Sequence, residues 1–183
     1  LAGLWDGLNK ISQSILALFS LTLSVYLLPK FSSITDSSIL RSEIIKGFKF
    51  IVISNQAGIK RKLVDVHDLE NIHRNMISSL LDEGVEILDI YYCPHFFDDY
   101  CDCRKPEPGM FYNVSSDWFI KLDETLYIGD AVSDIMAAYN AGTKSIFLGE
   151  GNELKDLPES EMPIEISKRL TESIPTILKY FIK

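Results

Sequence analysis

All three cysteines of the chain and one of its three histidines lie between residues 93 and 103. These four residues are Cys93, His95, Cys101 and Cys103. Three thiolates and one imidazole make a complete tetrahedral set of the kind that a structural Zn²⁺ takes, with no position left for water. Such ligands favour zinc over magnesium or calcium, which prefer oxygen. The alternative is a set of unpaired core thiols beside a chance histidine. Because the spacing is typical of metal ligands, we predict a zinc site that fixes a loop and performs no chemistry itself.

Three polar residues outside this cluster could act on a phosphoryl group. Asp130 offers a carboxylate oxygen suited to Mg²⁺, Lys105 offers a fixed positive charge, and Ser54 offers a hydroxyl beside backbone N–H groups. A transferring phosphoryl group requires positioning and charge neutralisation of this kind. Each signal alone is weak, because a Gly-Asp pair is often only a turn and a lysine is usually a solvated surface charge. Their order, each at a strand end, favours the joint interpretation.

The elements that must position these residues alternate along the chain. We predict strands at 47–54, 85–92, 125–128 and 144–148 from short apolar, β-branched runs. Helices are predicted at 65–83, from 108 onward, at 133–141 and at 164–182, the last amphipathic and interrupted near Pro175. Gly84 and Gly142 follow two of these helices as C-caps would. The alternation predicts a three-layer α/β fold, a doubly wound parallel sheet that binds ligands beyond the carboxyl ends of its strands.

Composition narrows the class of protein. A chain of 183 residues with 24% charged residues fits one ordinary domain, and no linker or repeat divides it. The net charge of −8 counts against nucleic acid as a partner, since phosphate backbones need a basic face. Three cysteines with metal-type spacing fit a reducing compartment better than a disulfide framework, so we expect a cytoplasmic protein. We also expect a monomer.

The N-terminal part contains one apolar run, ILALFSLTLSVYLL at residues 15–28. The run is shorter than the roughly 18–20 residues of a membrane-spanning helix. A signal peptide is the alternative, but no basic region precedes the run and no clear cleavage site follows it. We therefore expect a buried strand or helix, and no membrane partner.

Four segments resemble the haloacid dehalogenase superfamily of phosphatases: SNQAGI at 54–59, YYCPH at 91–95, CDCRKPEPGM at 101–110 and YIGD at 127–130. More narrowly, they are similar to the zinc-containing D-glycero-D-manno-heptose 1,7-bisphosphate 7-phosphatases. Histidinol-phosphate phosphatase domains share the zinc loop, but the run PEPGM after Lys105 is more like the heptose enzymes. The resemblance covers about residues 45–150 and implies Mg²⁺-dependent removal of the 7-phosphate of a sugar bisphosphate through an aspartyl phosphate.

The resemblance implies a role for each matching residue. Ser54 would donate a hydrogen bond to the phosphoryl group, Lys105 would neutralise its charge, and Arg104 would recognise the second phosphate. Asp130 would hold Mg²⁺ together with the backbone of Ala131, and Asp134 would support them from behind. The residues expected to line the substrate pocket are Asn55, Gln56 and Ala57. The zinc ligands carry over as Cys93, His95, Cys101 and Cys103.

The superfamily's first motif, Asp-x-Asp-Gly-Thr, is absent from this sequence. Its first aspartate attacks phosphorus and its second acts as acid and base. The nearest remnant is Trp5-Asp6-Gly7, which places Asp6 at the acid/base position and Leu4, which cannot attack phosphorus, at the nucleophile position. We favour Asp6 over Asp36 as a catalytic residue, because no similar motif surrounds Asp36.

The missing motif also raises a structural question. In this fold the nucleophile strand lies between the strands that end at Ser54 and Asp130, and an empty slot would leave buried backbone groups unpaired at about 1–3 kcal/mol each. Residues 21–28 (LTLSVYLL) have strand-like content and could fill it. Residues 1–44 are then an altered reading of a normal enzyme, part of a relative that binds without turnover, or the source of an unrecognised aspartate. The abrupt start of the match near residue 45 favours the first, with 45–183 as the phosphatase-like core.

Overall fold

The computed structural model describes residues 48–82 and 85–181 of the chain. The five strands in these ranges are β1 (Phe50–Asn55), β2 (Ile87–Cys93), β3 (Leu126–Gly129), β4 (Lys144–Leu148) and β5 (Glu165–Ser167). The α-helices are α3 (Ala57–Lys60), α4 (Val66–Asp82), α5 (Gly109–Trp118), α6 (Val132–Ala141) and α7 (Ile174–Phe181). Short 3₁₀ turns are η1 (Phe97–Asp99), η2 (Leu122–Glu124), η3 (Asn152–Leu154) and η4 (Glu159–Glu161).

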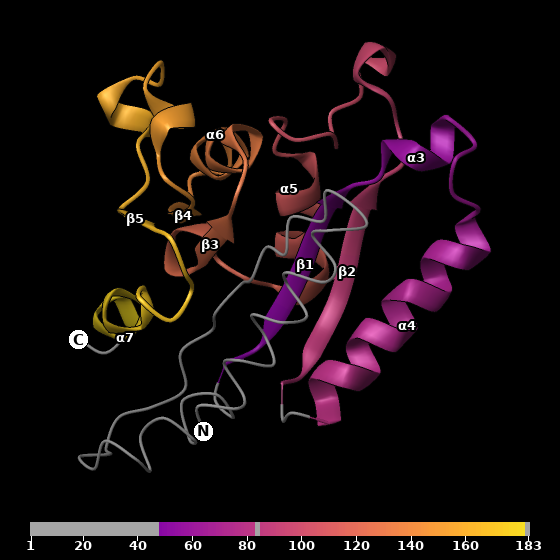
Figure 1. The fold of residues 1–183 in the computed structure, drawn as a ribbon, viewed down its shortest axis with the longest axis horizontal. Coiled ribbons are helices and arrows are strands. Elements are labelled where there is room, and N and C mark those ends of the chain that lie inside the picture. Colours follow the sequence, from indigo (N-terminus) through magenta and orange to yellow (C-terminus); the bar gives the residue numbers. More distant parts are fainter. Residues whose placement is uncertain (1–47, 83–84, 182–183) are drawn as a thin grey trace.

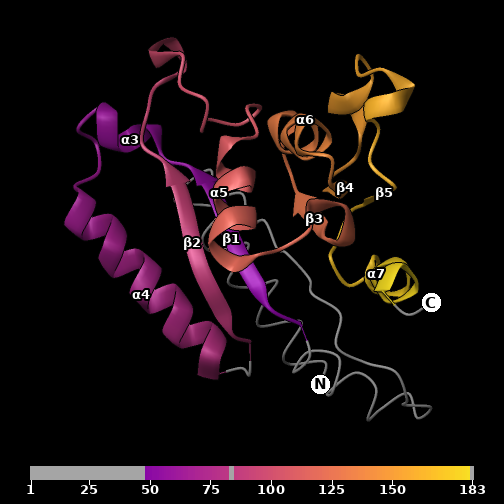
Figure 2. The same ribbon diagram turned by 180° about the vertical axis from the view of Figure 1, so that it is seen from behind.

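All strand pairs among the described residues are parallel. β1 pairs with β2, and β4 lies between β3 and β5. Figures 1 and 2 show the two sheets side by side, with β1 and β3 on their facing sides. Within the described ranges neither of these two strands pairs on its inner side. The strand expected between them would come from residues 1–47, and the proposed contribution of residues 21–28 lies outside the described residues.

Alternating side chains place helices on both faces of the sheets, because successive strand residues point in opposite directions. In β1, Val52 packs with Met76 and Leu80 of α4, whereas Ile51 and Ile53 belong to a cluster that includes α5. In the other sheet, residues of β3 and β4 pack with Ile177 of α7 on one face. Tyr127 joins α5 and α6 on the opposite face, so one core spans both sheets. The predicted three-layer α/β fold is confirmed.

The predicted terminal helix at 164–182 is wrong in its first part. Residues Glu165–Ser167 form β5, because they pair in register with β4 and the Gly149 N–H donates to the Ser167 carbonyl at 2.9 Å. The helix begins only at Ile174. Pro175 lies in its first turn, where a missing N–H breaks no intrahelical hydrogen bond, so this proline starts the helix and does not interrupt it.

The other predicted elements agree within a few residues with those observed. Gly142 has φ = 77° and ends α6 as the predicted left-handed C-cap, while Gly84 lies outside the described residues. Among the described helices, none has the length and apolar character needed to span a membrane. The apolar run at 15–28 also lies outside the described residues.

Candidate active site and metal centre

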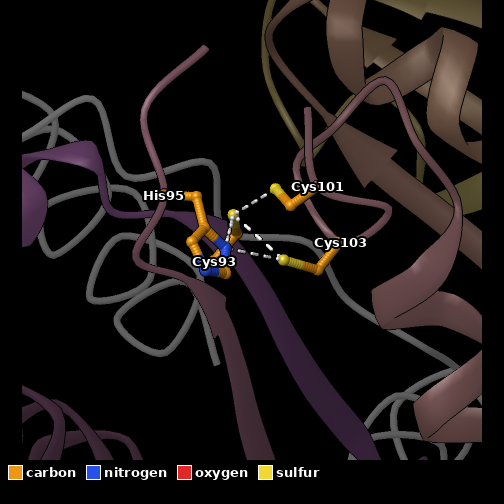
Figure 3. A group of neighbouring side chains, drawn as sticks. All are labelled: Cys93, His95, Cys101 and Cys103. Carbon is orange, nitrogen blue, oxygen red and sulfur yellow. Dashed lines mark hydrogen bonds between the residues drawn. The ribbon is translucent and has the colours of Figure 1, made fainter. Parts of the chain in front are cut away.

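The four predicted zinc ligands converge at the end of β2 (Figure 3). Their ligand atoms all lie within 4.8 Å of one another. Cys93 Sγ is 3.2 Å from Cys103 Sγ and 3.6 Å from Cys101 Sγ, and His95 Nδ1 is 3.2 Å from Cys103 Sγ. Tetrahedral zinc with ordinary bond lengths separates such atoms by about 3.5–3.8 Å. The three thiols are free of disulfides, so the cluster can hold one metal ion.

The electrostatics of this cluster favour a cation. Burial raises the pKa of the Cys93 thiol, and its hydrogen bond with Cys103 raises that pKa further. A backbone hydrogen bond from His95 opposes this rise in pKa. A bound cation would reverse the balance, because a metal ion stabilises the deprotonated sulfur.

The loop that carries the cluster is held by α3. The Phe96 N–H donates to Asp99 Oδ2 at 2.8 Å, and Lys60 Nζ lies 3.0 Å from Asp99 Oδ1. These two bonds hold the pKa of Asp99 below its usual range. The Arg61 guanidinium lies 5.9 Å from the centre of the Phe96 ring, within reach of a cation–π contact.

Lys105 is the centre of the second site and is buried, with only 3% of its surface exposed. Its ammonium lies 2.6 Å from Asp134 Oδ1, 3.0 Å from the Ile53 carbonyl and 3.1 Å from the Tyr127 hydroxyl. Burial lowers the pKa of Lys105, and the Asp134 carboxylate opposes that shift. The sequence predicted a positive charge at residue 105. In the structure this ammonium is desolvated and paired with Asp134.

Asp134 links this lysine to the loop after β3. Its Oδ2 accepts a hydrogen bond from the Ala131 N–H at 3.0 Å. Gly129 allows the approach, since a Cβ there would lie 2.4 Å from Asp134 Cβ. Asp130, the residue after Gly129, is half-buried. Burial raises its pKa, the Asp134 carboxylate raises it further, and the Lys105 ammonium opposes the rise. The carboxylate of Asp130 and the backbone of Ala131 therefore lie where a divalent cation could bind.

The residues at the end of β1 and directly after it lie at the same edge of the sheet. Ser54 is fully buried, and its Oγ accepts a hydrogen bond from Gln56 Nε2 at 2.8 Å. Asn55 does not present its amide to a pocket: Nδ2 donates to the Lys105 carbonyl at 3.1 Å and Oδ1 accepts from the Lys105 N–H at 3.0 Å. Ala57 is half-buried at the start of α3. Through these two hydrogen bonds, Asn55 fixes the position of the Lys105 backbone.

Arg104 connects the two sites. Its guanidinium donates to the His95 carbonyl at 3.2 Å and is half-buried, so one N–H holds the metal loop. Gly109 closes the turn from the other side, because its N–H donates to the Asp102 carbonyl at 2.9 Å and a Cβ would lie 2.4 Å from that oxygen.

The structure thus brings most of the predicted site residues to one edge, while Asp6 and Asp36 lie outside the described residues. Sequence reasoning missed Tyr127 and the steric need for Gly129. The available signal for Tyr127 was a hydroxyl within a strand whose other residues are Leu126, Ile128 and Gly129. A polar group in a fully buried strand needs a hydrogen-bond partner.

The comparison with known proteins agrees with this geometry. The HAD-hydrolase-like family matches residues 102–173. The D-glycero-beta-D-manno-heptose-1,7-bisphosphate 7-phosphatase of Pseudomonas putida is 33% identical over 120 residues, which cover 63% of this chain and 69% of that protein. The histidine biosynthesis bifunctional protein HisB of Campylobacter jejuni is 36% identical over 104 residues, but these cover 57% of this chain and only 30% of that protein.

A solved structure extends the similarity to three dimensions. The D,D-heptose 1,7-bisphosphate phosphatase of B. bronchiseptica, complexed with magnesium and phosphate, matches with a TM-score of 0.63 and 31% identity, covering 70% of this chain and 73% of that one. A HAD-like phosphatase from Mesorhizobium loti, at 19% identity and a TM-score of 0.64, supports the fold alone. The buried Lys105–Asp134 pair lies beside Asp130, and the Pseudomonas putida relative is 33% identical and covered over 69% of its length. The chain therefore belongs to the haloacid dehalogenase-like family of phosphatases.

Proposed function

We propose that this chain is a Mg²⁺-dependent phosphatase that removes the 7-phosphate of D-glycero-D-manno-heptose 1,7-bisphosphate. The observation that carries the proposal is the buried ion pair between Lys105 and Asp134, 2.6 Å apart, beside the half-buried carboxylate of Asp130. A desolvated ammonium and a carboxylate at the carboxyl end of parallel strands suit the binding of a phosphoryl group and its metal ion.

Each of several described residues has its own role in binding the phosphate groups. Lys105 neutralises phosphoryl charge, and the Ser54 hydroxyl, oriented by Gln56, donates a hydrogen bond to a phosphoryl oxygen. Asn55 fixes the backbone that carries Lys105, and the backbone at Ala57 borders the pocket. The N–H groups of Arg104 that the His95 carbonyl does not use are available to the second phosphate of a bisphosphate, in the bidentate geometry that guanidinium favours.

Two metal ions belong to the proposal. Mg²⁺ would be held by Asp130 and the backbone of Ala131, and it would supply charge for the phosphoryl oxygens. Zn²⁺ would be held by Cys93, His95, Cys101 and Cys103 and would fix the loop that leads into Arg104. The closed ligand set leaves zinc a structural role.

The attacking group of the proposed aspartyl-phosphate mechanism lies outside the described residues. Asp6 is our first candidate for catalysis and Asp36 the second. We propose that residues 45–183 form the phosphatase-like core and that the N-terminal segment supplies the strand between β1 and β3.

Histidinol phosphate is the second candidate substrate, favoured by the similarity to HisB over 104 residues. The heptose bisphosphate remains the better proposal, because the heptose phosphatase of Pseudomonas putida matches over 69% of its length and HisB over 30%. The names of these heptose enzymes specify the β anomer, which we propose for this chain as well. The three free thiols gathered at one site suit a reducing compartment, and we propose a cytoplasmic monomer.

The testing experiment is Mg²⁺-dependent phosphate release by the purified chain, with heptose 1,7-bisphosphate and histidinol phosphate in parallel. We expect release from the bisphosphate, and faster release than from histidinol phosphate. Faster release from histidinol phosphate would reverse the choice of substrate. Thermal stabilisation by phosphate ligands without release would identify a sugar-phosphate-binding protein that does not catalyse, since ligand binding alone raises stability.

A further inference from the structure

The Tyr127 hydroxyl is a third member of the buried charge pair. Tyr127 lies in β3 with its side chain fully buried. Its hydroxyl oxygen is 3.1 Å from Lys105 Nζ and 3.2 Å from Asp134 Oδ1, and those two atoms are 2.6 Å apart. A tyrosine hydroxyl can accept one hydrogen bond and donate another at the same time. Here it accepts from the ammonium and donates to the carboxylate.

Core packing fixes the position of this hydroxyl. The Tyr127 ring packs against Phe111 of α5 with centroids 4.8 Å apart and planes at 46°. Both side chains are fully buried, and they belong to the cluster that joins the two sheets. The hydroxyl therefore cannot follow a moving lysine, and it defines a fixed point for the ammonium to meet.

Lysine needs such fixed points because four rotatable bonds separate its ammonium from the backbone. Among the described residues, three elements contact the Lys105 ammonium: β1 through the Ile53 carbonyl, β3 through the Tyr127 hydroxyl and α6 through the Asp134 carboxylate. Asp134 uses its other oxygen on the Ala131 N–H, next to Asp130. The Tyr127 hydroxyl thus touches both halves of the pair and orders the carboxylate oxygen that faces the lysine.

We propose that Tyr127 is a positioning residue of the phosphatase reaction, whose hydroxyl holds the Lys105 ammonium against Asp134 Oδ1 at the place where it meets the phosphoryl group. The inference rests on the proposed function. Shape alone does not account for the residue, since phenylalanine would fill the same space and make the same contact with Phe111.

Tyr127→Phe tests this directly, because it removes one oxygen and keeps the ring. We expect the Kd for inorganic phosphate, measured by calorimetry with Mg²⁺, to rise about 10- to 100-fold, the worth of one hydrogen bond to a charged group. With heptose 1,7-bisphosphate we expect kcat to fall by a similar factor while KM changes less. Tyr180→Phe is the matched control: its hydroxyl donates to backbone carbonyls of Asp123 and Thr125, just before β3, and phosphate affinity should not change.

A double-mutant cycle separates positioning from simple packing. In a Lys105→Met chain, the effect of Tyr127→Phe on the urea midpoint should differ from its effect in the wild type, because the hydroxyl contacts the ammonium directly and would then keep only its bond to Asp134. Wild-type phosphate affinity in Tyr127→Phe would overturn the role of Tyr127 and leave the proposed function intact. A wild-type chain that neither binds nor releases phosphate would instead contradict the proposed function, and the use of Tyr127 with it.

Discussion

The Cys/His cluster and the buried Lys105–Asp134 site are neighbours in the chain but are built in opposite ways. The cluster takes its four ligands from residues 93–103, and three of the four are only half-buried. In the Lys105–Asp134 site, described groups of β1, β3 and α6 contact the ammonium, and both ends of the ion pair are almost fully buried. We expect the cluster to depend on a bound ion for its cohesion, whereas the Lys105–Asp134 pair depends on the protein core.

This difference determines how each site should fail. Removing a metal ligand loosens a surface loop and leaves the sheets in place. Removing one partner of a buried ion pair leaves an uncompensated charge in the core, which costs far more than the pair itself contributes. Two residues connect the sites: Asn55 contacts the Lys105 backbone, and Arg104 contacts the His95 carbonyl in the metal loop. A substitution in one site can therefore affect the other.

The largest effect is expected for Lys105→Ala. The substitution leaves Asp134 buried without its cation, which we expect to lower the free energy of unfolding by about 3–5 kcal/mol. Urea unfolding measures this loss, and calorimetry should detect no phosphate binding. Metal analysis should still find zinc, because the cluster ligands are untouched.

The matched control for that variant is Lys121→Ala. Lys121 also has an acidic partner, Glu124 at 2.8 Å, but both side chains are largely exposed. An exposed pair contributes little, so stability and phosphate affinity should stay close to wild type. Retained phosphate binding in Lys105→Ala would remove the proposed role of this lysine.

Cys101→Ser is the corresponding break in the metal cluster. We expect zinc content to fall from one ion per chain to none, and the unfolding free energy to fall by about 4 kcal/mol when free zinc is 1,000 times Kd. Thermal melts with and without a chelator measure the effect: the chelator should lower the melting temperature of the wild type but not of the variant. Unchanged metal content together with an unchanged melting temperature would contradict the zinc site.

Gly129→Ala tests how tightly the backbone packs against Asp134 in the Lys105–Asp134 site. The new Cβ would lie 2.4 Å from Asp134 Cβ, so Asp134 must move, at a cost of about 1–3 kcal/mol. We expect weaker phosphate binding at unchanged zinc content. The control is Gly142→Ala, whose Cβ meets nothing within 4 Å but whose φ of +77° costs about 1–2 kcal/mol. Equal loss of phosphate affinity in both variants would show that general destabilisation is the cause.

The same contrast explains what the sequence could predict. The cluster is a local pattern, so spacing alone located its four residues, and the structure brings them together. The alternation of strands and helices also predicted the parallel α/β fold, because it depends on local periodicity. Ser54 lies at the end of β1, Asp130 directly follows β3, and Lys105 lies in the loop after β2. Their positions could be predicted because the carboxyl ends of parallel strands lie at one edge of a sheet.

Contacts between distant segments were out of reach. The Tyr127 hydroxyl meets Lys105 across 22 residues, and Asn55 meets it across 50, which no local pattern encodes. The predicted helix at 164–182 failed for a related reason: pairing with β4, not local propensity, makes a strand of Glu165–Ser167. The preference for tertiary contacts over local pattern is strongest in such short segments.

Asn55 offers the sharpest test of whether the two sites act separately. Its amide makes two hydrogen bonds to the backbone of Lys105, two residues after the metal ligand Cys103. Asn55→Ala removes both bonds, and we expect the unfolding free energy to fall by about 1–2 kcal/mol. Asn55→Asp keeps the acceptor for the Lys105 N–H but turns a carboxylate oxygen toward the Lys105 carbonyl oxygen, so we expect it to lose at least as much stability as Asn55→Ala.

The informative measurement on these variants is affinity for both ligands. Because the backbone of Lys105 continues from the metal loop, we expect Asn55→Ala to weaken phosphate binding severalfold and to speed the transfer of zinc to a competing chelator. Weaker phosphate binding with unchanged zinc transfer would mean that the cluster is held by its own ligands and by α3 alone. If both affinities stay at wild-type values, the Asn55 amide is not what positions Lys105, and the contacts of the Lys105 ammonium suffice.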